Sequence, residues 1–142
     1  MKKYWKKILY GIMLMTFTAA GYGFYLFNKK PADIRTLPYK YELTAPKLVG
    51  DFNKDETAAD KKYVDKVIAV KGKISEVKLE PSTGQATVIL DSGDPMASVT
   101  CSFYDDEAGS LKGLKQGEAI VVKGRCIGKL MDVVLNKCSI QK

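Results

Sequence analysis

Three cysteines are the side chains of this sequence with the most versatile chemistry. Cys101, Cys126 and Cys138 occur in a chain of 142 residues that contains no histidine. The absence of histidine excludes Ser-His-Asp and Cys-His nucleophile systems, histidine-liganded zinc sites and imidazole pH switches. The cysteines form no CxxC motif, and no nearby acid would complete a ligand set. We therefore expect neither a metal site nor a cofactor.

The cysteines leave several interpretations open. Cys126 and Cys138 fall on strands that we expect to be neighbours, so a disulfide between them is the first interpretation. A tight hairpin centred near Leu130 would place Cys138 opposite about Val122, however, and each residue of offset adds roughly 3.3 Å along the strand. Cys101 and Cys138 could also be neighbours where the barrel closes. The third interpretation is three small buried apolar residues. An odd number of cysteines outside the cytoplasm leaves at least one without a partner in the same chain.

The acidic residues offer no catalytic pair. Asp105, Asp106 and Glu107 suit the first turn of a short helix, where the helix dipole favours acids. Asp91 and Asp94 bracket a turn, and only their proximity suggests a paired-carboxylate site. The sequence contains no phosphate loop, nucleotide fingerprint or metal motif. We therefore expect a protein that is not an enzyme.

The positive charge of the chain is concentrated at its N-terminus. The formal net charge is +7, from 23 Lys and Arg against 16 Asp and Glu. Six of the lysines lie within residues 1–30, which contain no acid, so residues 31–142 carry 17 basic and 16 acidic groups. This larger part is nearly neutral, and the basic composition is no evidence that it binds nucleic acid.

A transmembrane helix is expected at residues 8–27, which form a run of 20 residues without a charge. At about 1.5 Å per residue, a helix of this length spans the roughly 30 Å hydrocarbon core of a bilayer. Residues 1–7 form the more basic flank, which the positive-inside rule assigns to the cytoplasm. We expect a single-pass signal anchor in the inner (cytoplasmic) membrane, with a periplasmic or otherwise extracytoplasmic C-terminal domain. A cleaved signal peptide ending near Ala20 is the alternative.

Residues 28–50 are expected to form a linker. Pro31, Pro38 and Pro46 resist helix formation, so the stretch is interpreted as an extended tether. The domain would then occupy residues 51–142 and begin with a short helix over about 53–64. Asp51 or Asn53 would cap the N-terminus of this helix.

The remaining residues predict a small closed β-barrel. Strand patterns occupy residues 66–79, 86–90, 97–104, 118–127 and 132–140, with a short helix over about 107–114. The alternation of apolar and polar residues slips near Ser75 and Glu76 and again before Cys138, which indicates two β-bulges. This order of elements is that of an OB-fold, so we predict a mainly β protein with a five-stranded OB-fold barrel. Matching Val-Lys-Gly triplets at 70–72 and 122–124 fit the first and fourth strands, which pair and coil sharply in such a barrel.

Several blocks of this sequence resemble a known family. They are KY at 62–63, KVIAVKG at 66–72, VTCSF at 99–103, LKQG at 114–117, VVKGRCIG at 121–128 and DVVLNKCSI at 132–140. They resemble the tRNA_anti-like family, which consists of small bacterial OB-fold domains in Bacteroidetes-type membrane and lipoprotein-like proteins. The resemblance covers about residues 51–140 and implies an OB-fold. The family name refers to likeness to the anticodon-binding domains of tRNA synthetases and not to an activity.

OB-folds usually bind ligands on the face of their second and third strands. Here the outward residues would be Thr87, Ile89, Ser98, Thr100, Ser102 and Tyr104. Proteins that bind single-stranded nucleic acid place stacking aromatic residues and cations on this face, whereas here Tyr104 alone could stack and no cation is present. The loop between the fourth and fifth strands adds Lys129, Leu130 and Met131. The ligand-binding candidates are therefore Tyr104, Lys129 and Met131.

A separate basic patch is expected on the paired first and fourth strands. Its members, which should all point outward, are Lys71, Lys73, Lys123 and Arg125. The patch could contact phosphates, anionic lipid or an acidic partner, or it could simply keep the barrel surface soluble.

We conclude from the sequence that this is a membrane-anchored, extracytoplasmic OB-fold binding module without catalytic activity. Its partners would be the inner membrane and an unknown protein, envelope component or small molecule. The alternative is a nucleic-acid-binding protein, an interpretation that depends on fold analogy alone.

Overall fold

The computed structural model describes residues 2–29 and 32–141. Met1, Lys30, Pro31 and Lys142, which the sequence assigns to the basic N-terminus, the linker and the end of the domain, lie outside the described residues. The chain divides into two compact units, residues 1–32 and residues 33–142, which are described separately.

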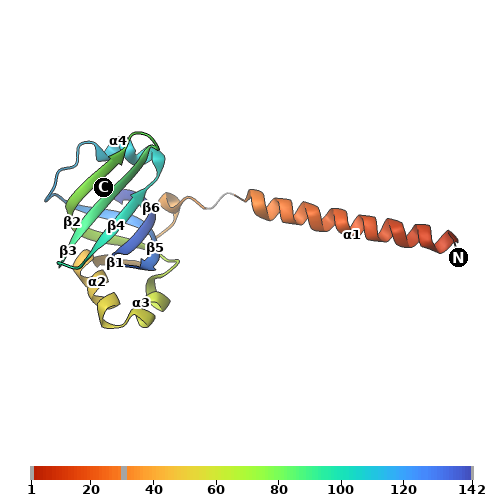
Figure 1. Ribbon diagram of the computed structural model, residues 1–142, viewed down its shortest axis with the longest axis horizontal. Coiled ribbons are helices and arrows are strands. Elements are labelled where there is room, and N and C mark those ends of the chain that lie inside the picture. Colours follow the sequence, from red (N-terminus) through yellow and green to blue (C-terminus); the bar gives the residue numbers. More distant parts are fainter. Residues whose placement is uncertain (1, 30–31, 142) are drawn as a thin grey trace. The chain divides into compact units, whose positions relative to one another are not determined.

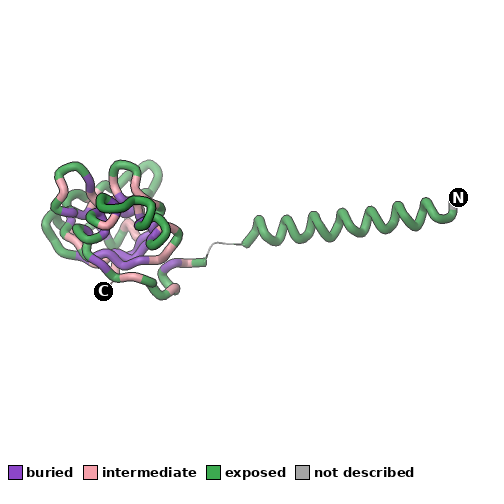
Figure 2. The backbone as a smooth tube through the Cα atoms, turned by 90° about the horizontal axis from the view of Figure 1, so that it is seen from below, coloured by how far each residue is buried: buried purple, intermediate pink, exposed green. Residues whose placement is uncertain are grey.

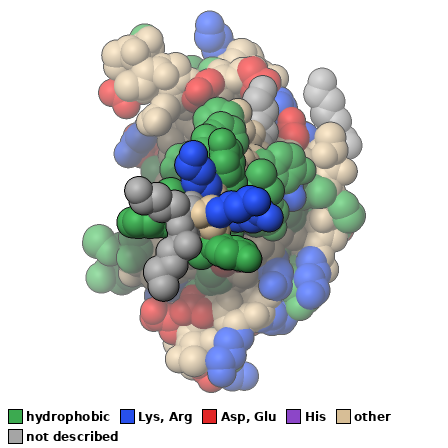
Figure 3. Space-filling model, turned by 90° about the vertical axis from the view of Figure 1, so that its right-hand side faces the viewer, with side chains coloured by type: hydrophobic (Ala, Val, Ile, Leu, Met, Phe, Trp, Pro, Cys, Tyr) green, Lys and Arg blue, Asp and Glu red, His purple; other side chains and the backbone are tan. Residues whose placement is uncertain are grey.

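The first unit is one long helix, α1 (Lys2–Asn28). A helix of this length rises about 40 Å, and the stretch Lys3–Asn28 is long and apolar enough to cross a membrane. Figure 3 looks toward the N-terminal end of α1, where apolar and basic side chains surround the helix. A signal sequence would share these properties, so the helix is a candidate for either an anchor or a signal.

The second unit is built on a closed barrel of five strands (Figure 1). They are β2 (Val67–Glu80), β3 (Gln85–Asp94), β4 (Ala97–Phe103), β5 (Ala119–Lys129) and β6 (Val133–Gln141). Antiparallel pairing joins β2 to β3, β3 to β4, β5 to β6 and β2 to β5, and β4 pairs with β6 in parallel. The β2–β5 pairing closes the barrel, which confirms the predicted OB-fold. The observed strands differ from the predicted ones mainly in β3, which continues through residues 91–94, where a turn was expected.

Both predicted β-bulges are present. The β2–β3 register shifts between Ile74 and Glu76. In the β4–β6 pairing, Cys101 lies opposite Leu135 and Phe103 lies opposite Cys138. Two residues of β4 therefore correspond to three residues of β6, which leaves one extra residue on β6. The bulges bend the strands so that the sheet can close on itself.

Glycine in the middle of β2 and β5 allows close packing, as the matching triplets predicted. A Cβ atom at Gly72 would lie 3.1 Å from the Cβ atom of Ala45. A Cβ atom at Gly124 would lie 2.5 Å from the sulfur atom of Cys138. Any larger residue at Gly124 would therefore overlap the packed interior. Figure 2 shows that the buried residues lie mainly in this barrel.

The predicted linker is wrong from Asp33 onward. This stretch contains the 3-10 helix η1 (Ile34–Thr36), the strand β1 (Tyr41–Thr44) and the helix α2 (Ala45–Lys54). Strand β1 pairs in parallel with β2, and α2 buries Leu48, Val49 and Phe52 in the core. Pro46 does not prevent the helix, because it lies in the first turn, where proline costs no hydrogen bond.

Two helices replace the one that was predicted over residues 53–64. Asp55 ends α2 and caps α3 (Glu56–Tyr63), since its carboxylate accepts a hydrogen bond of 3.0 Å from the Ala58 N–H. Figure 1 shows α2 and α3 at one end of the barrel and α4 (Ala108–Leu111) at the other. The 3-10 helix η2 (Asp105–Glu107) leads into α4, which buries Leu111 in the core. Both ends of the barrel interior are thus covered by helices.

Candidate ligand-binding face

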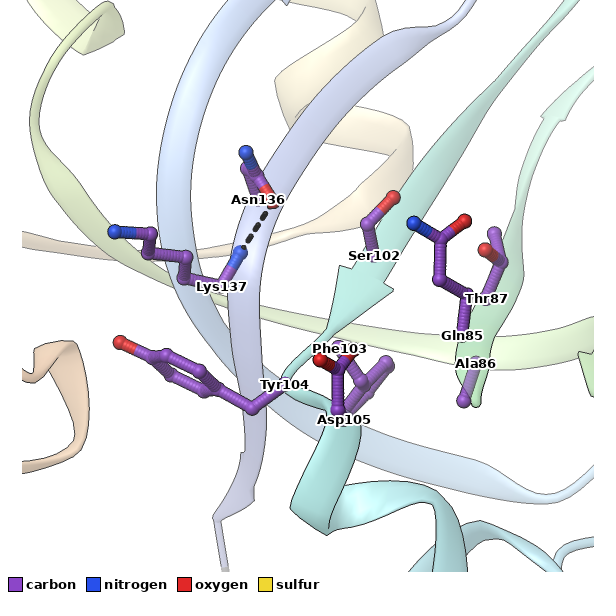
Figure 4. A pocket seen from close by; sticks show the side chains of 9 residues that line it. All are labelled: Gln85, Ala86, Thr87, Ser102, Phe103, Tyr104, Asp105, Asn136 and Lys137. Carbon is purple, nitrogen blue, oxygen red and sulfur yellow. Dashed lines mark hydrogen bonds between the residues drawn. The ribbon is translucent and has the colours of Figure 1, made fainter. Parts of the chain in front are cut away.

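A pocket of about 340 Å³ lies where β3, β4 and β6 meet (Figure 4). Its lining is mainly polar and consists of Gln85, Ala86, Thr87, Ser102, Phe103, Tyr104, Asp105, Asn136 and Lys137. It occupies part of the expected OB-fold ligand face, since its lining includes Thr87 of β3, Ser102 of β4 and Tyr104, which directly follows β4. Its volume lies at the low end of the range for sites that hold small molecules.

The bulge in β6 supplies one wall of the pocket. Lys137 has a φ angle of 52°, and its backbone N–H donates a hydrogen bond of 2.8 Å to the side-chain oxygen of Asn136. This left-handed conformation is uncommon for a lysine. Asn136 and Lys137 both line the pocket, although consecutive residues of a regular strand would lie on opposite faces.

Tyr104 connects the pocket to the residues that follow α1. Its hydroxyl oxygen accepts a hydrogen bond of 3.1 Å from the Ile34 N–H, and the Arg35 guanidinium lies 4.6 Å from the centre of its ring. Ile34 is fully buried. The ligand candidate Tyr104 therefore lines the pocket, but the Arg35 cation already covers one face of its ring.

Arg35 is held by several acids. Its guanidinium forms ion pairs of 2.7 Å with Asp33 and 2.8 Å with Asp106. Hydrogen bonds from the Arg35 side chain lower the pKa of Asp33 to about 2, and the same contacts raise the pKa of Arg35. The positive charge of Arg35 is thus neutralised within the unit and is of little use to a ligand.

The other two ligand candidates do not reach the pocket. Lys129 donates a hydrogen bond of 2.6 Å to the side-chain oxygen of Asn53, and Met131 is 81% exposed. Both residues lie at the end of the barrel where β6 begins, near the pairing of Val99 with Val133. The pocket lies at the opposite end of the β4–β6 pairing, beyond Cys101. The structure therefore does not combine Lys129 and Met131 with Tyr104 in one site.

The predicted basic patch is interrupted. Lys123 is buried instead of pointing into solvent, because residues 35–37 cover it and its ammonium donates hydrogen bonds to the carbonyl oxygens of Arg35 (3.0 Å) and Leu37 (2.7 Å). Lys71 and Lys73 are exposed and line a shallow groove of about 410 Å³, whereas Arg125 is half-buried and pairs in the sheet with Val67 and Asn136. Without Lys123, no continuous patch of four cations remains.

The three cysteines are free and buried. Cys126 pairs in the sheet with Leu135 and is a free thiol, so the possible Cys126–Cys138 disulfide is not present. Register shifts on β5 and β6 also place Val122 opposite Ile140 and not opposite Cys138. Burial raises the pKa of the Cys126 thiol to about 11. Burial and the neighbouring Cys101 thiol raise the pKa of Cys138, so these thiols stay protonated and pack as small apolar groups.

Asn136, Lys137 and Asp105 are pocket residues that we did not select from the sequence. The slip in alternation before Cys138 pointed to the bulge, but not to the side chains that it would present. No group of three or more Cys, Asp or Glu in residues 2–29 and 32–141 is placed to hold a metal ion.

A comparison with protein-family models identifies one match. The family described as tRNA_anti-like matches residues 1–140. The chain belongs to the tRNA_anti-like family. The match includes α1 as well as the barrel, whereas the resemblance seen in the sequence alone began at about residue 51. No curated protein matches the chain.

Two solved structures are reported as similar to this tRNA_anti-like chain. A Klebsiella pneumoniae protein with the printed name "putative nucleic acid-binding lipoprotein" has a TM-score of 0.59 at 15% identity. The alignment covers 70% of this chain and 91% of that one. A Leishmania major protein with the printed name "putative aspartyl-tRNA synthetase" has a TM-score of 0.49 at 13% identity, over 74% of this chain and 22% of that one. At such identities the likeness to the Klebsiella protein establishes the fold alone.

Proposed function

We propose that this tRNA_anti-like protein is a membrane-anchored, extracytoplasmic binding module that takes a small polar ligand and catalyses no reaction. The observation that carries the proposal is the pocket between β3, β4 and β6. Gln85, Thr87, Ser102 and Asn136 offer amide and hydroxyl groups there, and Lys137 and Asp105 add one charge of each sign. Such a set favours a ligand with several hydrogen-bonding groups and little net charge.

Helix α1 and its flanking charges support the anchored, extracytoplasmic location. The described span Lys3–Asn28 has the length and hydropathy of a transmembrane helix. The sequence before residue 8 is more basic than the sequence after residue 27. By the positive-inside rule this arrangement keeps the N-terminus in the cytoplasm and exports the barrel.

Nucleic-acid binding is the second candidate, favoured by the OB-fold and by the printed name of the Klebsiella lipoprotein. Single-stranded nucleic acid needs a cationic groove and free aromatic faces. In this protein the pocket has one cation, Tyr104 has Arg35 over one ring face, and Lys123 is buried. The small polar ligand therefore agrees better with the geometry.

The proposal is tested by calorimetric titration of the full chain in detergent micelles. The probes are N-acetylglucosamine, glycerol 3-phosphate and a single-stranded oligothymidine. We expect a small probe to bind, and Gln85→Ala to weaken its binding about tenfold through loss of side-chain hydrogen bonds. The matched control is Gln116→Ala, which changes an exposed glutamine outside the pocket. An oligothymidine affinity that falls steeply with salt and is weakened by Lys71→Glu would favour the second candidate instead.

A further inference from the structure

We infer that Arg125, Asn136 and Lys137 form a second site, on the outer face of β5 and β6, which binds a phosphate group with two negative charges. This inference goes beyond the proposed function, because it does not depend on a ligand in the pocket. Two observations carry it: a buried guanidinium nitrogen without a hydrogen-bond partner, and a neighbouring amide and ammonium that are both free to donate.

Arg125 has a charge that the folded unit does not neutralise. Its side chain is half-buried, and its Nε atom is buried without a hydrogen-bond partner among the described residues. None of the ion pairs within residues 2–29 and 32–141 includes Arg125. Arg35, the other arginine of the chain, instead pairs with Asp33, Asp106 and Glu107. A buried charged donor without an acceptor is costly, so an acceptor from outside the chain would stabilise Arg125.

Asn136 lies beside Arg125 and offers a further donor. The two residues pair between β5 and β6, so their side chains project from the same face of the sheet. The side-chain oxygen of Asn136 already accepts the hydrogen bond of 2.8 Å from the Lys137 N–H (Figure 4). The other end of the amide is an NH2 group, which donates and does not accept.

Lys137 adds a second positive charge next to Arg125. It follows Asn136 in the bulge of β6, and no ion pair among the described residues includes it. Figure 4 draws its ammonium pointing away from Ser102 of β4, and β5 is the strand that pairs with β6 on the side away from β4. Like charges on neighbouring strands repel each other, and an anion bound between Arg125 and Lys137 would remove this repulsion.

The other charges that the backbone brings to this face leave it positive. Lys123 lies two residues before Arg125 on β5, but residues 35–37 cover its ammonium, so it adds positive potential without being exposed to a ligand. The Asp65 N–H donates to the carbonyl oxygen of Cys126 at 2.9 Å. No ion pair of the described residues, however, joins the Asp65 carboxylate to Arg125.

The chemistry of the three free groups favours a phosphate over a carboxylate. The guanidinium is a planar fork that can bond two oxygen atoms of either anion. The site has two unpaired cations, however, and a phosphate monoester carries a charge of about −1.5 to −2 at pH 7. A carboxylate would neutralise only one of the two cations. A phosphate also has enough oxygen atoms to accept from Arg125, Lys137 and the Asn136 amide together.

The test is calorimetric titration of the full chain, in micelles of an uncharged detergent at pH 8 and low ionic strength, with inorganic phosphate. We expect phosphate to bind, and acetate to bind about tenfold more weakly because its charge is smaller. Absence of phosphate binding, or equal affinity for acetate, overturns the inference.

Variants of Arg125 identify the guanidinium as the main partner. Arg125→Met keeps an apolar stem but removes the charge, and we expect the phosphate affinity to fall about tenfold or more. Phosphate should also raise the midpoint of thermal unfolding of the parent chain but not that of Arg125→Met. Arg125→Lys keeps the charge without the fork and should bind phosphate several-fold more weakly than the parent. Unchanged affinity in both variants overturns the inference.

A matched pair of lysine variants tests the second charge. Lys137→Gly should lower the phosphate affinity about fivefold, and glycine suits the positive φ at this position. Lys112→Gly removes an exposed lysine that lies on neither β5 nor β6 and should keep the affinity of the parent. Equal losses in the two variants would reveal a general effect of net charge and overturn the site.

Gln85→Ala distinguishes this site from the pocket. A phosphate affinity that falls in Gln85→Ala but not in Arg125→Met would assign the phosphate to the pocket, which overturns the second site and leaves the proposed function intact. Phosphate binding that depends on Arg125, without binding of N-acetylglucosamine in the titration above, supports the second site while the proposed function loses its support.

Discussion

The ammonium group of Lys123 lies 2.7 Å from the backbone carbonyl oxygen of Leu37 and donates a hydrogen bond to it. The lysine is only 6% exposed, and a second hydrogen bond joins it to the carbonyl of Arg35. A buried charge is tolerated only where such partners replace water. The contact thus fastens residues 35–37 to β5.

Replacement of Lys123 by methionine should loosen the attachment of residues 35–37 to the barrel. In Lys123→Met the carbonyls of Arg35 and Leu37 lose their donor, and we expect the free energy of unfolding to fall by about 1–3 kcal/mol. Urea unfolding of the full chain in detergent, followed by tyrosine fluorescence, measures the change. Lys73→Met on the exposed surface of β2 is the control and should stay within about 0.5 kcal/mol of the parent. Equal losses in both variants would contradict a special role for Lys123.

The Asp33–Arg35 pair should make stability depend on pH in the acid range. Hydrogen bonds from Arg35 lower the pKa of Asp33 from 3.8 to about 2 in the folded state. Since the folded pKa lies below the unfolded one, the stabilisation is complete above about pH 4 and is lost as the pH falls toward 2. Thermal unfolding between pH 2 and pH 6 should show this loss, and it should be smaller in Asp33→Asn. An identical pH profile for the variant would exclude the pair as a cause.

Gly124→Ala should be strongly destabilising, because the added methyl group would overlap the sulfur atom of Cys138. The added Cβ would lie 2.5 Å from the Cys138 sulfur, and overpacking of this kind costs about 1–3 kcal/mol. Cys138→Ala in the same chain should recover much of that loss, which a double-mutant cycle measures. Gly50, in contrast, lies in α2, and a Cβ atom added there would have no neighbouring atom within 4 Å. Gly50→Ala should therefore raise the free energy of unfolding by about 0.5–1 kcal/mol. Simple additivity of the Gly124 and Cys138 changes would contradict the contact.

The three thiols should resist modification in the folded protein. Burial raises the pKa of Cys126 to about 11 and raises that of Cys138 as well, so little thiolate forms near neutral pH. Mass spectrometry after maleimide treatment should find no label on the native chain and three labels after denaturation. Fewer than three labels on the denatured, unreduced chain would reveal a disulfide and contradict the free thiols of this structure.

The orientation of α1 in the membrane determines on which side the barrel lies and therefore which ligands can reach the pocket. Protease added to cells with a permeabilised outer membrane should digest residues 33–142 while the inner membrane is intact, and an antibody to the barrel follows the loss. The positive-inside rule gives this outcome. Protection until the inner membrane is broken would place the barrel in the cytoplasm and make nucleic acid the first ligand to test.

The barrel was predictable from the sequence because most of its strands alternate. Val99, Cys101 and Phe103 point inward as expected, and both slips in alternation correspond to bulges. A period of two is a strong local signal in half-buried strands. The short β1 gave no comparable signal, because four residues contain too few alternations and Pro38 and Pro46 lie on either side of it.

The site was less predictable, because it depends on contacts between distant parts of the chain. Lys123 has the outward position expected from its strand, yet residues 35–37 lie over it. Lys137 lines the pocket next to Asn136, where the bulge gives Lys137 a positive φ that no local pattern predicts. Tyr104 lines the pocket, but no local pattern revealed that Arg35 would cover its ring.

The packing of residues 33–54 also determines where the protein can be shortened. A soluble version that begins at residue 51, the predicted start of the domain, would lack Ile34, Ala45 and Leu48, all of which are fully buried. It would also lack β1, so β2 would present a bare edge to which another chain could add. Such a fragment should aggregate, whereas one that begins at Asp33 keeps the complete folded unit.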